Sequence, residues 1–199
     1  MKSLLSPLQV RLLHLLANLG WTLTGGAALA GFHLGHRTTR DLDLFWTGTS
    51  TLDRIPAEVV RRLTEAGLDV QRLQAAPGFV CLRVEGDGEV LPVDLVAEPM
   101  APIEAPIEVE PGVLVDTTHV ILVNKFNALL SRWAVRDLVD VRELLAAGGD
   151  FDRALRDAHT RDGGFSPQTL AWVLDTAPRA GLDATLLAFR EELVRRLLA

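Results

Sequence analysis

The chain has 199 residues, of which 48% are hydrophobic and 23% are charged, and its formal net charge is −6. These values are typical of a globular protein and exclude a disordered tail, a fibrous protein and a low-complexity scaffold. The acidic balance argues against a broadly basic nucleic-acid binder, although it leaves room for a local basic patch. The single cysteine, Cys81, excludes an intrachain disulfide and a multi-cysteine zinc site. No apolar run is long enough to span a membrane and residues 1–5 are too short for a signal peptide, so we expect a cytoplasmic protein with no membrane partner.

The first predicted element is a helix that begins at Ser6-Pro7, where Gln9 completes a capping box and Gly20 ends the apolar pattern. The following predicted strands are residues 21–24, 42–46, 68–73, 79–84 and 90–96, and the helices between them are residues 27–34 and 55–67. The stretch 98–112 holds four prolines, which predicts a loop or an edge strand because proline cannot donate to a sheet ladder.

No strand is predicted beyond residue 116. The helical pattern of residues 120–147 fits one long helix or two, and further helices are predicted over residues 151–159, 167–174 and 184–198. We therefore expect an α/β (α+β) protein with a mixed-sheet core over residues 1–115 and a helical region over residues 116–199.

Three carboxylates lie in unusual settings. Asp41 and Asp43 are two apart at the start of an apolar strand, so their side chains share a face. Asp94 interrupts a second apolar strand. If the two strands are neighbours, the three carboxylates converge, and a cation such as Mg²⁺ would offset their repulsion. The alternative is a purely structural role for each residue: Asp41 caps a loop, Asp43 ends a strand, and Asp94 is solvated on a sheet edge.

A glycine pair precedes these acids. Gly25 and Gly26 lie at a strand-to-helix turn, where a bare backbone can approach a phosphate. Such a pair alone is more often only a turn. The order of strand, glycine pair, short helix, paired aspartates on a strand and a distant strand aspartate is much more specific.

The segments 23–29, 35–39 and 41–45 resemble the AbiEii/AbiGii-type nucleotidyltransferase toxins, which belong to the DNA polymerase β-like superfamily and act in type IV toxin–antitoxin and abortive-infection systems. The resemblance returns at Asp94 and over residues 125–145, and we identify no motif of the family in residues 146–199. It implies a polymerase β-like core, an NTP substrate and an antitoxin partner.

The resemblance also implies residue roles in the first part of the chain. Gly25 and Gly26 correspond to the turn that holds the triphosphate. Asp41 and Asp43 correspond to paired metal ligands, and Asp94 to the third carboxylate, which helps to deprotonate the acceptor hydroxyl. Arg37 matches a Gly-His-Arg segment and can contact phosphate.

In the second part, Lys125 looks like the downstream motif lysine of the family, and residues 136–140 look like its Arg-Asp-x-x-Asp motif. Lys125 is one of only two lysines among the 20 basic residues, which favours a specific use of its compact charge. On one continuous helix, Lys125, Arg132 and Arg136 would form a basic stripe facing the nucleotide, oriented by Asp137 or Asp140. The alternative is a solvated charged face.

The sequence thus predicts a metal-dependent transfer of a nucleoside monophosphate from an NTP to an acceptor. The expected catalytic residues are Asp41, Asp43, Asp94, Lys125 and Asp137, in a cleft between the two parts. The expected nucleotide-binding residues are Gly25, Gly26, Arg37, Lys125, Arg132, Arg136 and Asp140. Asp41, Asp43 and Asp94 are expected to hold two Mg²⁺ ions. RNA, at the tRNA 3′ end, is the first acceptor to consider; the alternatives are a small molecule of the aminoglycoside type, a protein, or a catalytically inactive nucleotide-binding module.

Overall fold

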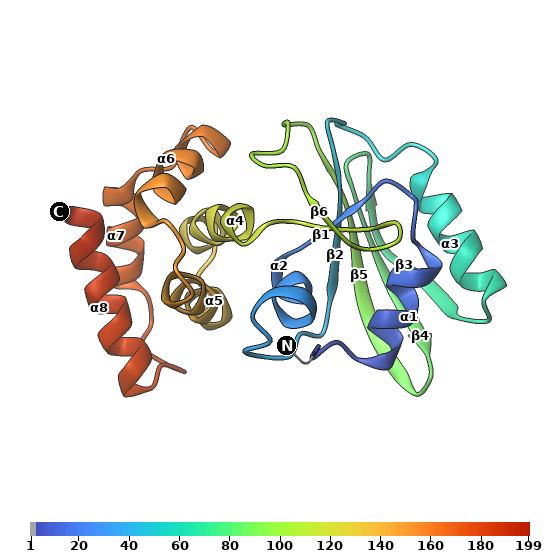
Figure 1. Cartoon of the computed structure of the whole chain (residues 1–199), viewed down its shortest axis with the longest axis horizontal. Helices are drawn as coiled ribbons and strands as arrows, with labels where there is room; N and C mark the ends of the chain where they lie inside the picture. The colour runs from blue at the N-terminus through green and yellow to red at the C-terminus, as the bar shows by residue number, and fades with distance from the viewer. Residues whose placement is uncertain (1–2) are drawn as a thin grey trace. The chain divides into compact units, whose positions relative to one another are not determined.

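The computed structural model describes residues 3–199, and the chain divides into two compact units that meet between Thr117 and Thr118. The first unit, up to Thr117, contains a seven-stranded sheet and short helices (Figure 1). Its helices are α1 (Pro7–Leu15), α2 (Gly25–Ala28), the π-helical turn η1 (Leu29–His33) and α3 (Ile55–Glu65). Its strands are β1 (Thr22–Thr24), β2 (Leu42–Thr47), β3 (Asp69–Ala76), β4 (Phe79–Gly86), β5 (Glu89–Glu98), β6 (Ile107–Glu110) and β7 (Val113–Val115).

The sheet has the strand order β3-β4-β5-β2-β1-β7-β6. The pairs β2–β5 and β1–β7 are parallel and the remaining pairs are antiparallel, so the sheet is mixed, as predicted. The strand at residues 107–110 is an edge strand, which agrees with the proline-rich sequence before it.

Apolar and polar side chains alternate along the central strands, so one face of the sheet is fully buried. Leu42, Leu44 and Trp46 of β2 are buried, whereas Asp43 and Phe45 are half-buried. Figure 1 shows α1 and α3 on one side of the sheet and α2 on the other. The acidic residues of the central strands are therefore on a separate face from the leucines that form the core.

Two details of the first unit differ from the sequence prediction. Helix α1 ends at Leu15 rather than near Gly20, because Asn18 (φ 63°) and Gly20 (φ 79°) take left-handed conformations that a helix cannot continue through. Strand β7 was not predicted, because three residues are too few to show a period; β7 forms by pairing with β1.

The second unit, from Thr118 onward, is helical in all its regular elements among the described residues. These are α4 (Thr118–Ser131), α5 (Val135–Ala146), α6 (Phe151–Arg161), α7 (Pro167–Thr176) and α8 (Ala184–Leu198). Asp150, Ser166 and Asp183 cap the last three helices by accepting from backbone N–H groups.

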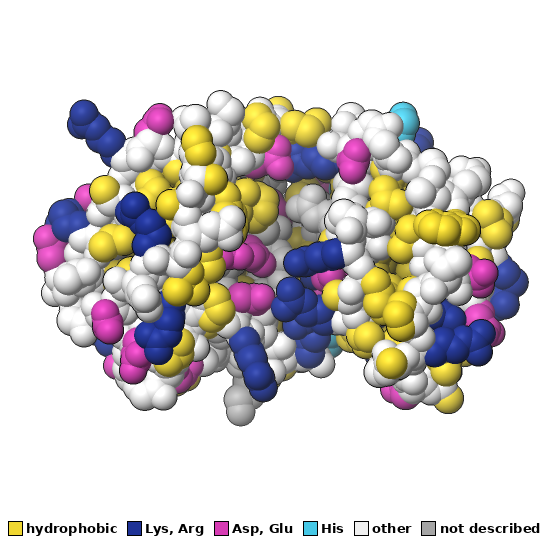
Figure 2. Space-filling view, turned by 180° about the vertical axis from the view of Figure 1, so that it is seen from behind, with side chains coloured by type: hydrophobic (Ala, Val, Ile, Leu, Met, Phe, Trp, Pro, Cys, Tyr) yellow, Lys and Arg dark blue, Asp and Glu magenta, His cyan; other side chains and the backbone are white. Residues whose placement is uncertain are grey.

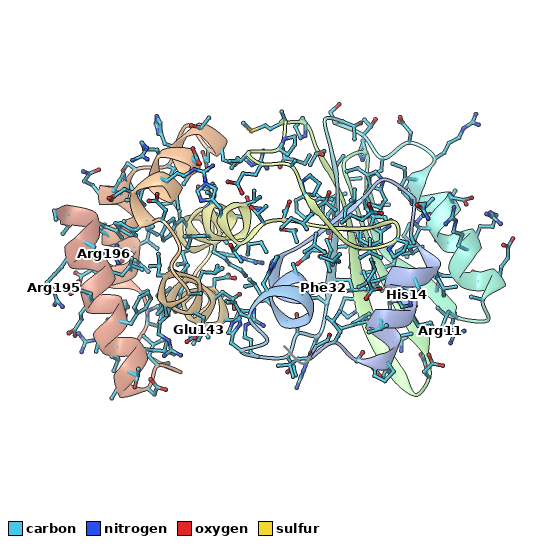
Figure 3. The ribbon with its side chains drawn as sticks, viewed as in Figure 1. Arg11, His14, Phe32, Glu143, Arg195 and Arg196 are labelled. Atoms are coloured by element: carbon cyan, nitrogen blue, oxygen red, sulfur yellow. The ribbon has the colours of Figure 1, made fainter. Side chains whose placement is uncertain are left out.

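Helix α8 is fastened to the rest of its unit partly by a cation–π contact. Figure 3 shows Arg195 and Arg196 side by side on α8, and the Arg196 guanidinium lies 4.0 Å from the centroid of the Phe151 ring on α6. Phe151 also meets Phe126 of α4 edge-on. Across residues 3–199, none of the helices combines the length and the hydropathy needed to cross a membrane.

Candidate active site

Four polar side chains form one row across the middle of the sheet. Thr24 of β1 is opposite Asp43 of β2, Asp43 is opposite Asp94 of β5, and Asp94 is opposite Cys81 of β4. Residues paired across neighbouring strands present their side chains on the same face, so we call these four residues the polar row. The parallel pairing of β2 with β5 makes the two strands neighbours, as the convergence of carboxylates requires.

The polar row contains buried atoms that lack hydrogen bonds. Neither Thr24 Oγ1 nor Asp94 Oδ1 has a hydrogen-bond partner within the described part of the chain. Leaving such an atom buried and unsatisfied costs about 1–3 kcal/mol, so native structures usually supply a ligand, an ion or a water. An orphaned carboxylate oxygen beside a second carboxylate suits a divalent cation. Within residues 3–199, no group of three or more His, Cys, Asp or Glu side chains could hold a metal ion, so this fit depends on Asp43 and Asp94.

The glycine pair lies directly against the carboxylates. Gly25 has φ +65°, and a Cβ placed on it would be 2.7 Å from Asp43 Oδ2. A Cβ on Gly26 would be 2.9 Å from Thr39 Oγ1 and 3.2 Å from the Arg37 guanidinium. Only a residue without a side chain allows these approaches, so the backbone of the turn is held next to Asp43.

Asp41 lies one residue before β2 and is held by its own loop. Thr39 Oγ1 donates a hydrogen bond to Asp41 Oδ1. Arg37 donates from Nη1 to the Thr38 carbonyl at 3.1 Å and also lies against Gly26. The structure therefore places Gly25 against Asp43, and it brings Gly26, Arg37 and Asp41 together around Thr39. The roles of these residues stay predictions.

Cys81 occupies the far end of the polar row. Burial, reinforced by a hydrogen bond to the Asp94 carboxylate and by its charge, raises the pKa of the Cys81 thiol to about 11. The thiol is therefore protonated at neutral pH and faces the Asp94 carboxylate as a donor from the neighbouring strand.

The motif residues of the second unit form a compact ionic cluster. Lys125 Nζ lies 2.6 Å from Asp137 Oδ1 and 2.7 Å from Asp140 Oδ2. Both aspartates are 0% exposed and Lys125 is 7% exposed. The sequence predicted that Asp137 or Asp140 orients a basic stripe; of its three members, Lys125 contacts both carboxylates. We name Lys125, Asp137 and Asp140 the lysine cluster.

The predicted basic stripe does not form. The helical region breaks between Ser131 and Val135, so Lys125 is on α4 whereas Arg136 is on α5. Lys125 is buried, but Arg132 and Arg136 are exposed, and Arg132 reaches Asp137 only at 3.6 Å. The prediction of a stripe assumed one continuous helix. Because the helix breaks, the three basic residues no longer share one side of a single helix.

Sequence reasoning missed four residues around the acids. Thr24 and Cys81 join them through strand register, and Thr39 and Gln9 through hydrogen bonds to the Asp41 loop. Gln9 had a visible signal as a capping-box residue, but its second contact spans 32 positions of the chain. A local pattern carries no information about such a distant partner.

Comparisons with known proteins give the family of the chain and its fold. Residues 10–198 match the family model described as nucleotidyl transferase AbiEii toxin, type IV TA system. Two solved structures from Helicobacter pylori are similar to this chain. JHP933 has 21% sequence identity and a TM-score of 0.58, and the match covers 96% of this chain and 90% of JHP933. A putative nucleotidyltransferase has 21% identity and a TM-score of 0.56, and the match covers 97% of this chain and 92% of that protein. The antibiotic-resistance factor ANT(2'')-Ia is similar at 19% identity and a TM-score of 0.50, covering 78% of this chain and 91% of its own. No curated protein matches the sequence.

The fold and the carboxylate-bearing strands define a nucleotidyltransferase with a polymerase β-like core. The family match spans nearly all of the chain, and the chain belongs to the AbiEii family of nucleotidyltransferase toxins of type IV toxin–antitoxin systems. Membership confirms the predicted family, fold class and enzyme class. It also implies an NTP substrate and an antitoxin partner.

Proposed function

We propose that this toxin transfers a nucleoside monophosphate from an NTP to a hydroxyl group of RNA, at the tRNA 3′ end. The observation that carries the proposal is the register of Asp43 with Asp94, with Gly25 against the Asp43 carboxylate. This arrangement places a bare backbone turn beside two carboxylates, one of which has a buried, unsatisfied oxygen.

In the proposed reaction, the acceptor oxygen bonds to the α-phosphorus of the NTP and the bond to the β-phosphate bridging oxygen breaks, which releases pyrophosphate. Asp94 takes the proton of the acceptor hydroxyl as general base. The Gly25-Gly26 turn holds the triphosphate, and Arg37 offsets part of its negative charge. The protein contributes chiefly by positioning and by electrostatic stabilisation.

In the proposal, Asp43 and Asp94 would hold Mg²⁺ together with the phosphates of the NTP. Asp41, which does not group with them into a three-carboxylate site among residues 3–199, would complete the ligand set for two ions when the nucleotide is bound. Bound Mg²⁺ would supply positive charge for the phosphates and lower the pKa of the attacking hydroxyl. The hydrogen bond from Thr39 to Asp41 fixes that carboxylate before any ligand binds.

The residues predicted in the second unit fall into two groups, the lysine cluster and the exposed arginines. Asp137 and Asp140 hold Lys125 within the second unit, and the role of Lys125 toward the nucleotide stays a prediction. Arg132 and Arg136 are exposed, and their predicted contact with phosphate groups stays a prediction.

The acceptor class has a second candidate. Residues 1–117 contain 15 acidic and 9 basic residues, whereas residues 118–199 contain 11 of each, so the unit that carries the polar row bears the whole acidic excess. Figure 2 shows basic side chains interspersed with acidic ones on the visible face. This charge favours a cationic small molecule. A toxin, however, must modify something that growth requires, and the tRNA 3′ end meets that condition.

A competition between acceptors tests the proposal. The purified protein is incubated with Mg²⁺ and each labelled NTP in the presence of total RNA, total protein and a cationic aminoglycoside. We expect label in the tRNA fraction. Label in the aminoglycoside or in protein would show that this molecule, and not tRNA, is the acceptor. The absence of both label and pyrophosphate would favour the inactive nucleotide-binding module.

A further inference from the structure

Gln9 is a buried polar residue on α1 whose contacts extend beyond its own helix. It is 1% exposed, and it lies one residue before the match to the family model begins. Its backbone N–H donates to Ser6 Oγ at 3.2 Å, and its Oε1 accepts from the Ser6 N–H at 2.8 Å. These two bonds are the capping box of α1 and leave the side-chain N–H groups of Gln9 for another purpose.

The side-chain amide of Gln9 binds the backbone immediately before β2. Its Nε2 donates to the Asp41 carbonyl at 3.1 Å and to the Thr39 carbonyl at 3.4 Å. Thr39 in turn donates through Oγ1 to the Asp41 carboxylate. One amide group thus holds Asp41 by its main chain and, through Thr39, supports the contact that holds its side chain.

Helix α1 is a fixed base for this contact. Leu8 and Leu12 are 0% exposed in the core of the first unit. On the outer face, Arg11 bonds Asp87 at 2.9 Å and the Ala66 carbonyl at 2.7 Å. Figure 3 shows Arg11 and His14 on α1, and His14 contacts Glu110 at 2.6 Å. Contacts on both faces keep Gln9 in place while the Asp41 loop is held against it.

We propose that Gln9 is a positioning residue for Asp41, which fixes the loop of residues 39–41 so that the Asp41 carboxylate is pre-oriented for the nucleotide-bound metal. The proposal rests on the proposed function, in which Asp41 is a metal ligand. Partners that orient metal ligands typically change metal affinity or activity about 10–100-fold when they are removed.

The test compares two variants that separate the cap from the loop contact. Gln9→Glu keeps the length and the Oε1 acceptor of the capping box but replaces the Nε2 donor with an oxygen facing two carbonyls. Ser6→Ala removes the capping hydroxyl and leaves the Gln9 amide intact. Gln9→Met, uncharged and of similar length, replaces Gln9→Glu if that variant does not fold; it also removes the Oε1 acceptor of the cap, so its effect is read against that of Ser6→Ala.

The first readout is amide hydrogen exchange on the metal-free protein. We expect faster exchange over residues 37–43 in the Gln9 variant, about tenfold, and no change there in Ser6→Ala. The second readout is nucleotide transfer, in which the Gln9 variant should need about tenfold more Mg²⁺ for half-maximal rate while its KM for the NTP stays near wild type.

Unchanged exchange over residues 37–43 in the Gln9 variant would overturn the proposal, as would equal loosening in Ser6→Ala. An unchanged Mg²⁺ requirement in a protein that does transfer nucleotide would also overturn it. If the wild-type protein transfers no nucleotide, the proposed function fails instead, and the exchange experiment alone decides whether Gln9 fixes the Asp41 loop.

Discussion

At the scale of the residue, the backbone of Gly25 is the most constrained feature of the site. It has φ +65°, and its missing Cβ is what lets Asp43 Oδ2 approach. Gly25→Ala should lower the free energy of unfolding by about 1–2 kcal/mol through the left-handed conformation alone. It should also lower transfer about 100-fold, because the added methyl group displaces the Asp43 carboxylate. Thermal unfolding and a transfer assay measure the two effects.

Gly20→Ala is the matched control for this variant. Gly20 has φ +79° and no atom within 4 Å of the added Cβ. The control should lose a similar free energy of unfolding and keep its transfer rate. Equal losses of activity in the two variants would mean that backbone strain, not contact with Asp43, makes Gly25 necessary.

At the scale of the element, α3 carries a salt-bridge network with a defined pH response. Hydrogen bonds from Arg61, and then from Arg62, lower the pKa of Glu58 to about 2. A carboxyl whose folded-state pKa is depressed adds stability above its unfolded pKa and loses it as the pH falls toward the folded value. Glu58→Gln should therefore be less stable than wild type at pH 7, by a small amount that salt screens.

Urea unfolding of both proteins from pH 7 down to pH 3 checks this expectation. The difference in unfolding free energy should shrink below about pH 4.5 and approach zero toward about pH 2. A difference that stays constant across this range would show that the ion pairs of Glu58 contribute nothing and that the glutamine acts only through helix propensity.

The lysine cluster joins α4 to α5, and we expect it to contribute to the stability of the protein. Lys125→Met leaves the carboxylates of Asp137 and Asp140 buried without their cation, which typically costs about 3–5 kcal/mol. Adding Asp137→Asn and Asp140→Asn removes both charges and should restore most of that stability. Chemical denaturation of the single and triple variants measures the effect. A Lys125→Met protein that unfolds like wild type but no longer transfers nucleotide would assign the lysine to the substrate alone.

The elements with clear local patterns could be predicted from the sequence, and those formed by distant pairing could not. The cap at Ser6-Pro7 and the alternation around Asp43 are local signals, and both are confirmed. Strand β7 depends on β1 for its pairing, and the break after Ser131 carries no proline or glycine to announce it. The apolar pattern of residues 120–147 therefore continues across a turn that only tertiary packing explains.

The same distinction holds for the site. Asp41, Asp43 and Asp94 stand out because each is a charge beside apolar strand residues. Thr24 and Cys81 are ordinary strand residues in sequence, and only the register of four strands brings them into the polar row. Gln9 already had a sufficient local explanation as a capping residue, which concealed its contact with the Asp41 loop.

At the scale of the whole molecule, two units of different charge share one chain. The acidic excess lies entirely in residues 1–117, which also carry the polar row, while residues 118–199 are neutral. Carboxylates on the central strands gain from cations at neutral pH, so the acidic unit suits a site that works with Mg²⁺. The helical unit is neutral because its 11 acidic and 11 basic residues balance, and several of them form ion pairs on α6 and α8.

The central claim is that Asp43 and Asp94 form the reactive centre, and one assay tests it most directly. Transfer of labelled nucleotide to total RNA is measured for wild type, Asp43→Asn, Asp94→Asn and the control Asp69→Asn, an exposed aspartate on β3. Thermal unfolding confirms that each variant is folded. We predict that Asp94→Asn loses about 10²–10⁴-fold in rate, as expected for a general base, that Asp43→Asn loses at least as much, and that Asp69→Asn matches wild type. Rates for folded Asp43→Asn and Asp94→Asn equal to that of the control would contradict the assignment.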